Sequence, residues 1–313
     1  MDYKNLYVLG DSLSDTGSFI GILNDFSPRN VCFSAPFYEG RSFSNGPLAI
    51  EYLANKLNLP LKPGWQCDVF YKSSEQIGTN YAISNASASE ISTPLYRYFF
   101  NKFQLRNQLN ALIRHHPDIG EEDLFIIMIG GNDIMNAIFD KYPLQAIDRA
   151  IDEIYRTFAC LSDKNIKHII VSNVPNIGLI PAFVNKKDKS ILAAELTDRF
   201  DTELTNQIDN FKRKYTAVDI KKLDLKSKLN EIINSYREEE RNIRDACISD
   251  IADHQDLKMF LELIITGEFK ASYNPGCSEE NICDYLFFDY FHPTAEPHRI
   301  IGDYLYKLAT RNL

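Results

Sequence analysis

The sequence predicts an α/β protein in which a central, mostly parallel sheet lies between two layers of helices, a three-layer α/β/α sandwich. Short apolar runs of strand length recur along the chain, and each ends in polar or glycine-rich residues. Between them lie longer segments with apolar residues at every third or fourth position, as in amphipathic helices. Strands that alternate with helices favour parallel pairing, and the helices then cover both faces of the sheet.

Length and composition are those of a globular protein. The chain has 313 residues, of which 44% are hydrophobic and 25% are charged. Because the sequence shows no internal repeat, low-complexity segment or clear linker, we expect a single domain, residues 1–313. The net charge of −9 argues against a nucleic-acid partner, since binding phosphates needs a basic surface. The longest apolar run, residues 124–129, is too short to span a bilayer.

Three segments are candidates for buried strands: residues 6–9, 124–129 and 168–172. Residues 218–220 are a weaker fourth candidate. Ligands of parallel sheets bind beyond the carboxyl ends of the strands. The residues that directly follow the first two strands, including Ser12 and Asn132, are therefore expected at a shared site.

Two long helices are predicted by their periodic apolar residues. The first carries Leu144, Ile147, Ile151, Ile154, Phe158 and Leu161, and the second carries Leu192, Leu196, Phe200, Leu204, Ile208 and Phe211. We expect the last helix to start at Thr294, which is a good N-cap, with Pro297 in its first turn. The apolar residues 257–265 are expected in the core, with a cap over the substrate as the alternative.

Ser12 lies in a sharp corner. The apolar residues 6–9 run directly into Gly10-Asp11-Ser12-Leu13-Ser14-Asp15-Thr16-Gly17. A strand that ends in a turn before a helix can expose a serine hydroxyl at the open end of a sheet. Ser12 is therefore a candidate nucleophile, and the aspartates around it are expected to shape the loop by hydrogen bonding.

His292 is the best candidate for the base that such a serine needs. It lies in a loop just before the last helix, and Asp289 precedes it by three residues, close enough to orient its ring. Asp-x-x-His is common by chance, so the pattern gains its meaning from Pro293, Thr294 and the helix that follow. The other histidines are weaker candidates, and His298, in the final helix, is expected to have a structural role.

Four blocks, near residues 10–17, 80–88, 130–133 and 289–298, together resemble the GDSL-type (SGNH) lipases and esterases. The similarity is greatest to the bacterial branch of lysophospholipases, phospholipases A and glycerophospholipid:cholesterol acyltransferases. The resemblance implies an SGNH-hydrolase sandwich with Ser12 as nucleophile and Asp289 and His292 completing the triad. It also implies an oxyanion hole formed by the Ser12 N–H, the Asn132 side-chain amide and the Asn85 N–H. Asn85 occupies a position where the family usually has glycine.

The same resemblance implies hydrolysis of lipid carboxylic esters through an acyl-enzyme, with acyl transfer to an alcohol as a second use of that intermediate. The implied partners are a lipid ester and, transiently, a membrane surface. One alternative is a carbohydrate O-acetyl esterase or short-chain esterase. An alternative of another class is an inactive relative that binds ligands. The aromatic segment 96–103 is expected either to line an acyl site or to pack in the core. We expect no cofactor and no metal.

The cysteines bear on location. Cys277 and Cys283 bracket a short polar loop before Asp289, and we expect them either to form a disulfide or to remain two free thiols. A bridge would indicate an oxidising compartment. No basic-then-apolar leader precedes Leu6. We expect a secreted or periplasmic protein whose leader is absent from this numbering, with a cytoplasmic location or signal-independent export as the alternative.

Overall fold

The central sheet of the protein is parallel and lies between helices. The computed structural model describes residues 3–27, 30–64, 78–90, 101–249 and 266–311. Four strands pair in the order β1 (Leu6–Gly10), β3 (Leu124–Met128), β4 (His168–Ser172) and β5 (Asp219–Leu223). All three pairings are parallel. Residues 79–83 follow the outer edge of β1, where the Tyr81 N–H donates to the Val8 carbonyl.

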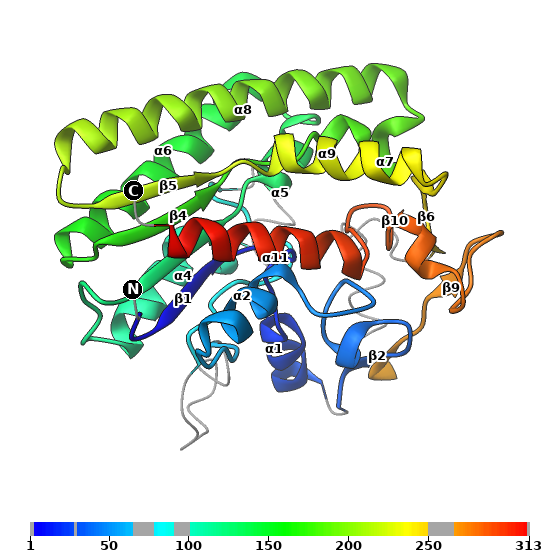
Figure 1. The fold of residues 1–313 in the computed structure, drawn as a ribbon, viewed down its shortest axis with the longest axis horizontal. Coiled ribbons are helices and arrows are strands. Elements are labelled where there is room, and N and C mark those ends of the chain that lie inside the picture. The colour runs from blue at the N-terminus through cyan, green and yellow to red at the C-terminus, as the bar shows by residue number, and fades with distance from the viewer. Residues whose placement is uncertain (1–2, 28–29, 65–77, 91–100, 250–265, 312–313) are drawn as a thin grey trace.

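Helices cover both faces of this sheet, so the predicted three-layer sandwich is confirmed. Figure 1 shows α2 and α11 in front of the strands, with α4 and α6 behind them. The helices are α1 (Ser18–Phe26), α2 (Ala49–Leu57), α4 (Leu105–His115), α5 (Gly131–Ala137), α6 (Pro143–Asp163), α7 (Pro181–Val184), α8 (Lys187–Lys214), α9 (Leu225–Glu238) and α11 (Ala295–Thr310). Short 3₁₀ turns are η1 (Tyr38–Gly40), η2 (Asn101–Phe103), η3 (Ile177–Leu179) and η4 (Ile282–Asp284).

Alternate strand residues serve two different cores. Tyr7 and Leu9 of β1 point into the larger core, which is completed by α4, α5, α6 and α8. Leu6 and Val8 point into the core beneath α2 and α11. Because both faces are covered, β1 and β3 are buried along their whole length, which explains why they appear in the sequence as continuous apolar runs.

A third apolar cluster lies outside the sheet. It joins residues of the first 43 positions to residues 247–288, and its aromatic members include Phe33, Phe37, Phe43 and Phe288. Three short strand pairs surround it: β2 (Cys32–Phe33) with β8 (Glu268–Phe269), β6 (Asn242–Ala246) with β10 (Tyr285–Phe287), and β7 (Ile248–Ser249) with β9 (Ser272–Tyr273). We refer to it as the aromatic cluster.

Neither expectation for Cys277 and Cys283, a disulfide between them or two free thiols, is correct. Cys277 is bonded to Cys247, thirty residues earlier, whereas Cys283 is exposed and unbonded. The antiparallel pairing of β7 with β9 returns the chain alongside Cys247, and the Asn274 N–H donates to the Cys247 carbonyl. Pairing of distant strands therefore selects the partner, and the local spacing from which the prediction was made carries no information about it.

Most predicted elements are confirmed. The strands at 6–9, 124–129 and 168–172 agree within one residue. Both long helices are present and extend beyond their predicted apolar residues, over Pro143–Asp163 and Lys187–Lys214. The fourth strand starts at Asp219 and continues to Leu223. Residues 257–265 and the aromatic residues 96–100 lie outside the described part of the chain. Phe103, at the end of that aromatic segment, packs against the larger core. Among the described helices, none combines the length and apolarity that a membrane span requires.

Candidate active site

Ser12 lies two residues after the end of β1, where Gly10 pairs with Met128 of β3. Gly10 must be glycine, because a Cβ there would lie 2.5 Å from the Met128 carbonyl oxygen. A buried side-chain amide fixes the strand end: Gln108 accepts from the Gly10 N–H and donates to the Gly10 carbonyl, both at 2.8 Å. Asp11 then accepts a hydrogen bond from the Leu13 N–H. The chain therefore turns sharply and holds Ser12 beyond the carboxyl end of the strand.

His292 and Asp289 meet Ser12 at hydrogen-bond distance. His292 Nε2 lies 2.7 Å from Ser12 Oγ, and its Nδ1 lies 2.7 Å from Asp289 Oδ2. Asp289 is fully buried, and its Oδ1 also accepts from the N–H groups of Phe291 and His292. These bonds hold the carboxylate in place. The arrangement can take the proton of a serine hydroxyl and stabilise the imidazolium that forms.

The loop that carries His292 is fixed by segments far away in the sequence. The ring of Phe43 stacks on the His292 ring, with centroids 5.0 Å apart and planes inclined by 23°. As expected, Thr294 is the N-cap of α11 and Pro297 lies in the first turn. The Thr294 hydroxyl, however, donates to the Tyr285 carbonyl. The first N–H of the helix, that of Ala295, donates instead to the Asn45 side chain.

Phe43 and Asn45 had no signal in the sequence. Both lie more than two hundred positions before the histidine that they support, in a segment without helical or strand periodicity. Their contribution becomes visible only when the fold brings that segment against the loop before α11.

The predicted oxyanion donors face the same cavity as Ser12. Asn132 lies in the first turn of α5, and its Nδ2 donates to the Ala86 carbonyl at 2.7 Å, which leaves its second N–H for a ligand. Asn85 has φ 66°, the left-handed conformation expected at a position where glycine is usual. Within the described residues, the N–H groups of Ser12 and Asn85 have no protein acceptor. Their roles as oxyanion donors remain predictions.

Buried aspartates shape these loops, as expected from the sequence. Asp15 accepts from the N–H groups of Gly17, Ser18 and Phe19 at the start of α1, and also from Ser84. Asp133 accepts from the N–H groups of Ala88 and Ser89. Each therefore ties the segment that carries Asn85 to a strand end of the sheet.

Burial alters the charge of two of these carboxyl groups. It raises the pKa of Asp11 to about 7 against the opposing effects of the Leu13 N–H and His292. It also raises the pKa of Asp133 to about 6, although the N–H groups of Ser89 and Ala88 lower it. Near neutral pH, Asp11 and Asp133 therefore spend part of their time protonated, which lowers the negative charge beside the candidate oxyanion site.

A large apolar cavity opens beside the Ser12 hydroxyl. The space within the cavity and in front of it, open solvent included, is about 1120 Å³. Its apolar lining includes Leu13, Met128, Met135, Val174, Ile177, Ile180, Leu225, Leu229, Phe291 and Ile301. His298 also lines it, and burial lowers the pKa of this histidine to about 3, so the ring is neutral. The described residues include no cluster of His, Cys, Asp or Glu side chains suited to a metal ion.

Comparison with known proteins agrees with this geometry. The family described as GDSL-like lipase/acylhydrolase matches residues 6–305, which include every residue of the candidate site. A GDSL esterase/lipase of Arabidopsis thaliana is 23% identical over 362 aligned positions, covering 98% of this chain and 82% of that relative. Another from the same plant is 31% identical over 174 positions, 49% of this chain and 42% of the relative.

A bacterial protein is similar over a shorter stretch. The phosphatidylcholine-sterol acyltransferase of Aeromonas hydrophila is 28% identical over 185 positions, which cover 59% of this chain and 48% of that enzyme. The partial matches span less than half of those relatives, whereas the family match extends over nearly all of this chain. The chain belongs to the GDSL-like lipase/acylhydrolase family, whose members are serine ester hydrolases.

Proposed function

We propose that the protein hydrolyses carboxylic esters of lipids, as lysophospholipases and phospholipases A do, through an acyl-enzyme on Ser12. The observation that carries the proposal is the large apolar cavity directly beside the Ser12–His292–Asp289 array. An acyl chain could be buried there because it carries no polar groups that would need hydrogen-bond partners. The mostly apolar lining suits an acyl chain better than an acetylated sugar, which favours lipid esters over the carbohydrate O-acetyl esterase alternative.

The hydrogen bonds of the site suggest the order of events. His292 Nε2 takes the proton of Ser12 Oγ as the oxygen attacks the ester carbonyl carbon, and Asp289 stabilises the imidazolium. The negative oxygen then accepts from the Ser12 and Asn85 N–H groups and the free Asn132 N–H. His292 returns the proton to the leaving alcohol, and the acyl group remains on Ser12.

Water completes hydrolysis of the acyl-enzyme, with His292 acting again as the base. An alcohol that takes the place of water would receive the acyl group instead. Similarity to the phosphatidylcholine-sterol acyltransferase of Aeromonas hydrophila supports testing this second outcome. We also propose a secreted or periplasmic location, which the Cys247–Cys277 disulfide favours because such bonds persist in oxidising compartments.

A substrate panel tests the proposal. We expect kcat/KM to be higher for lysophosphatidylcholine than for nitrophenyl acetate or acetylated xylan, with diacyl phosphatidylcholine as a further member of the panel. Preference for the acetyl esters would contradict the lipid assignment. A fluorophosphonate probe should label the protein but not its Ser12→Ala variant, because labelling needs an activated serine. An unlabelled, folded wild-type protein would instead indicate an inactive binding relative.

A further inference from the structure

Large apolar side chains are exposed mainly at one end of the molecule. In the part of the chain that the structure describes, six are more than a third exposed: Phe139, Tyr142, Leu144, Ile191, Tyr273 and Tyr290. Phe139 and Tyr142 follow β3 in the connection from α5 to α6, and Leu144 lies in the first turn of α6. Ile191 follows β4 near the start of α8, and Tyr290 follows β10. Figure 1 places β9, which carries Tyr273, at the same end. This is the end at which the strands stop and Ser12 lies.

Four of these side chains lie on two neighbouring segments, residues 139–144 and the start of α8. Phe139, Tyr142, Leu144 and Ile191, here called the apolar patch, are 60%, 51%, 58% and 50% exposed. Lys189 joins their two segments, because its Nζ lies 4.3 Å from the centroid of the Phe139 ring. The connection is an ordered turn: Asp140 accepts from the Tyr142 N–H at 2.8 Å and pairs with Arg149. Isolated exposed apolar residues are ordinary, but four at half exposure or more on one ordered surface mark an interaction site.

Lysines flank the apolar patch along the chain, with one exposed carboxylate, Asp188, among them. Lys141 Nζ lies 5.0 Å from the centroid of the Tyr142 ring, and Lys186 and Lys187 are exposed at the start of α8. Within the described residues, neither these three lysines nor Lys189 forms an ion pair. The chain as a whole carries a net charge of −9, so this positive rim opposes the general charge of the molecule. Rings flanked by lysine amines suit a lipid–water interface, where rings enter the headgroup layer and amines reach phosphates.

The apolar patch is close to the catalytic apparatus along the chain. Helix α5 starts beside the cavity with Asn132, contributes Met135 to the cavity lining, and ends two residues before Phe139. At about 1.5 Å per helical residue, roughly 10 Å of chain separates Asn132 from Phe139. A surface that held the apolar patch would therefore hold a lipid near the cavity.

We propose that the apolar patch and its lysine rim dock the enzyme on a phospholipid surface that contains anionic headgroups. This inference rests on the proposed lipid substrate, which it deepens by assigning the surface where that substrate is met. Docking would concentrate the enzyme on its substrate without any change in the chemistry at Ser12.

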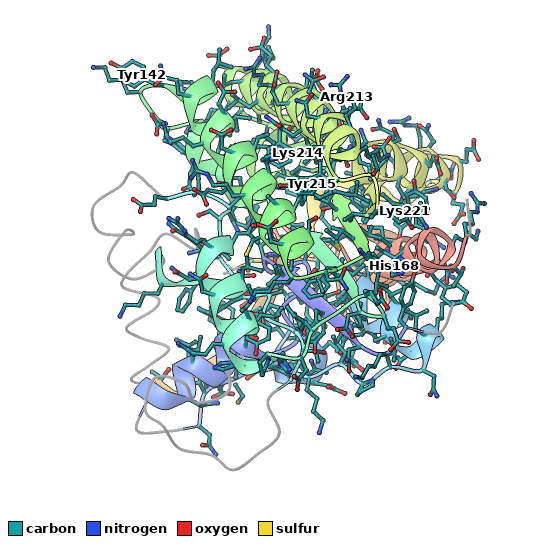
Figure 2. The ribbon with its side chains drawn as sticks, turned by 90° about the vertical axis from the view of Figure 1, so that its left-hand side faces the viewer. Tyr142, His168, Arg213, Lys214, Tyr215 and Lys221 are labelled. Carbon is teal, nitrogen blue, oxygen red and sulfur yellow. A yellow bond between two sulfur atoms is a disulfide. The ribbon has the colours of Figure 1, made fainter. Side chains whose placement is uncertain are left out.

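The opposite end of the molecule offers a matched control. There Lys214 Nζ lies 4.9 Å from the centroid of the Tyr215 ring, nearly the same pair as Lys141 and Tyr142. Tyr215, however, stacks on Phe211, with centroids 4.5 Å apart, so its ring is part of the packing. Figure 2 shows Tyr142 extending from the start of α6, well separated from the group formed by Arg213, Lys214 and Tyr215.

Vesicle co-sedimentation tests the docking directly. The full chain carrying Ser12→Ala, which cannot consume the lipid, is mixed with phosphatidylcholine vesicles that contain about one third phosphatidylglycerol. Tyr142→Ser with Leu144→Ser should lower partitioning about tenfold or more. Lys141→Glu with Lys189→Glu should do the same, and its effect should shrink on pure phosphatidylcholine and at high salt. Arg213→Glu with Lys214→Glu should change partitioning less than about twofold.

Activity separates docking from chemistry. In the active enzyme, the apolar-patch variants should keep their kcat/KM on a soluble nitrophenyl ester and lose turnover of vesicle lipid in proportion to binding. Unchanged vesicle binding by both double variants would overturn the proposal. So would a fall in oligomeric mass of the variants without any vesicle binding by the parent, since the patch would then join two copies of the chain. Failure to turn over monomeric lysophospholipid would remove the proposed function while leaving vesicle docking intact.

Discussion

The two halves of the candidate site are built in different ways. Ser12 and Asn132 follow β1 and β3, neighbouring strands of the central sheet that pair in register from Leu6 with Leu124 to Gly10 with Met128. Asp289 and His292 follow β10, which pairs with β6 outside that sheet. Sheet register therefore positions the nucleophile half, whereas contacts between distant segments position the base half.

The difference shows where each half should be vulnerable. The nucleophile half rests mainly on backbone pairing, supported at the strand end by the Gln108 amide. The base half rests on a stacked ring, an asparagine that caps α11, and a disulfide beside the aromatic cluster. Changes at those three supports should weaken the base half selectively, while loss of either half should abolish the chemistry.

Loss of the reacting groups should give the largest effect and erase the difference between the halves. Ser12→Ala and His292→Ala should each lower kcat on the order of 10⁴-fold, and the double variant should be hardly worse than either single one, because triad members act as a unit. Steady-state kinetics on a nitrophenyl ester measures this, with circular dichroism as the check on folding. Multiplying losses would show that the two residues act independently.

Within the nucleophile half, the two asparagines should behave differently. Asn132→Ala removes a side-chain donor and should lower kcat by roughly 10²–10³-fold. Asn85→Gly keeps both the backbone N–H and the left-handed conformation, so kcat should stay within about threefold of wild type. A large loss in Asn85→Gly would show that its side chain takes part in the reaction. Single-turnover rates distinguish this from a change in substrate binding.

The disulfide should stabilise the base half. Replacing Cys247 and Cys277 together by alanine should cost about 3–4 kcal/mol in unfolding free energy if the bond acts by restricting a thirty-residue loop. Urea denaturation measures the cost, and activity should fall at lower urea than the signal of the helices. Cys283→Ala, at the exposed cysteine, is the control and should leave both transitions where they were. If Cys283→Ala lowered the unfolding free energy as much as the double variant does, a different pairing of the cysteines would be indicated.

Removal of the Phe43 ring that stacks on His292 should have a smaller effect, and one that is selective for kcat. Phe43→Leu removes the stacked ring and should lower kcat roughly twofold to tenfold, the range expected for one aromatic contact. Phe37→Leu is the matched control, since Phe37 is equally buried in the aromatic cluster and its ring contacts are to other phenylalanines. Both should lower the melting temperature, but only Phe43→Leu should lower kcat. Equal kcat in the two variants would show that the Phe43 ring does not help to position His292.

The smallest effect concerns the buried carboxyl group beside the nucleophile. The pKa of Asp11 is raised by burial to about 7, so between about pH 4 and 7 the folded protein keeps a proton that the unfolded chain has lost. The folded state then binds more protons, and the free energy of unfolding falls as the pH rises. Asp11→Asn retains an acceptor for the Leu13 N–H but cannot bind this proton. Between about pH 4 and 7 its melting temperature should therefore fall by a few degrees less than that of the wild type. Parallel melting curves across that pH range would refute the assignment.

The contrast between the nucleophile half and the base half also explains which features of the site could be predicted from the sequence. Apolar runs end where β1 and β3 end, so the positions of Ser12 and Asn132 at the sheet edge were predictable from local pattern. The left-handed conformation of Asn85 followed from the family resemblance, which places Asn85 where glycine is usual, and asparagine tolerates that conformation. These features depend on a few consecutive residues.

Features that depend on distant partners were not predictable. The bond of Cys247 to Cys277, the ring of Phe43 on His292 and the amide of Gln108 on Gly10 each join segments at least thirty residues apart. No periodicity or spacing in one sequence encodes such pairs, since only the completed fold decides which segments meet. Similarity between blocks could suggest the partners of Ser12, but the residues that hold those partners in place had no local signal.

The long separation of Ser12 and His292 along the chain has a consequence for synthesis. His292 is translated 280 residues after Ser12, and it is seated by α11, the last helix of the described chain. That helix is itself tied down late: Lys221 donates to the carbonyls of Leu308 and Arg311 at its end. A ribosome-bound or prematurely terminated chain therefore displays a serine without a base. The serine becomes able to attack an ester only after His292 has been added and the loop before α11 has folded against Ser12.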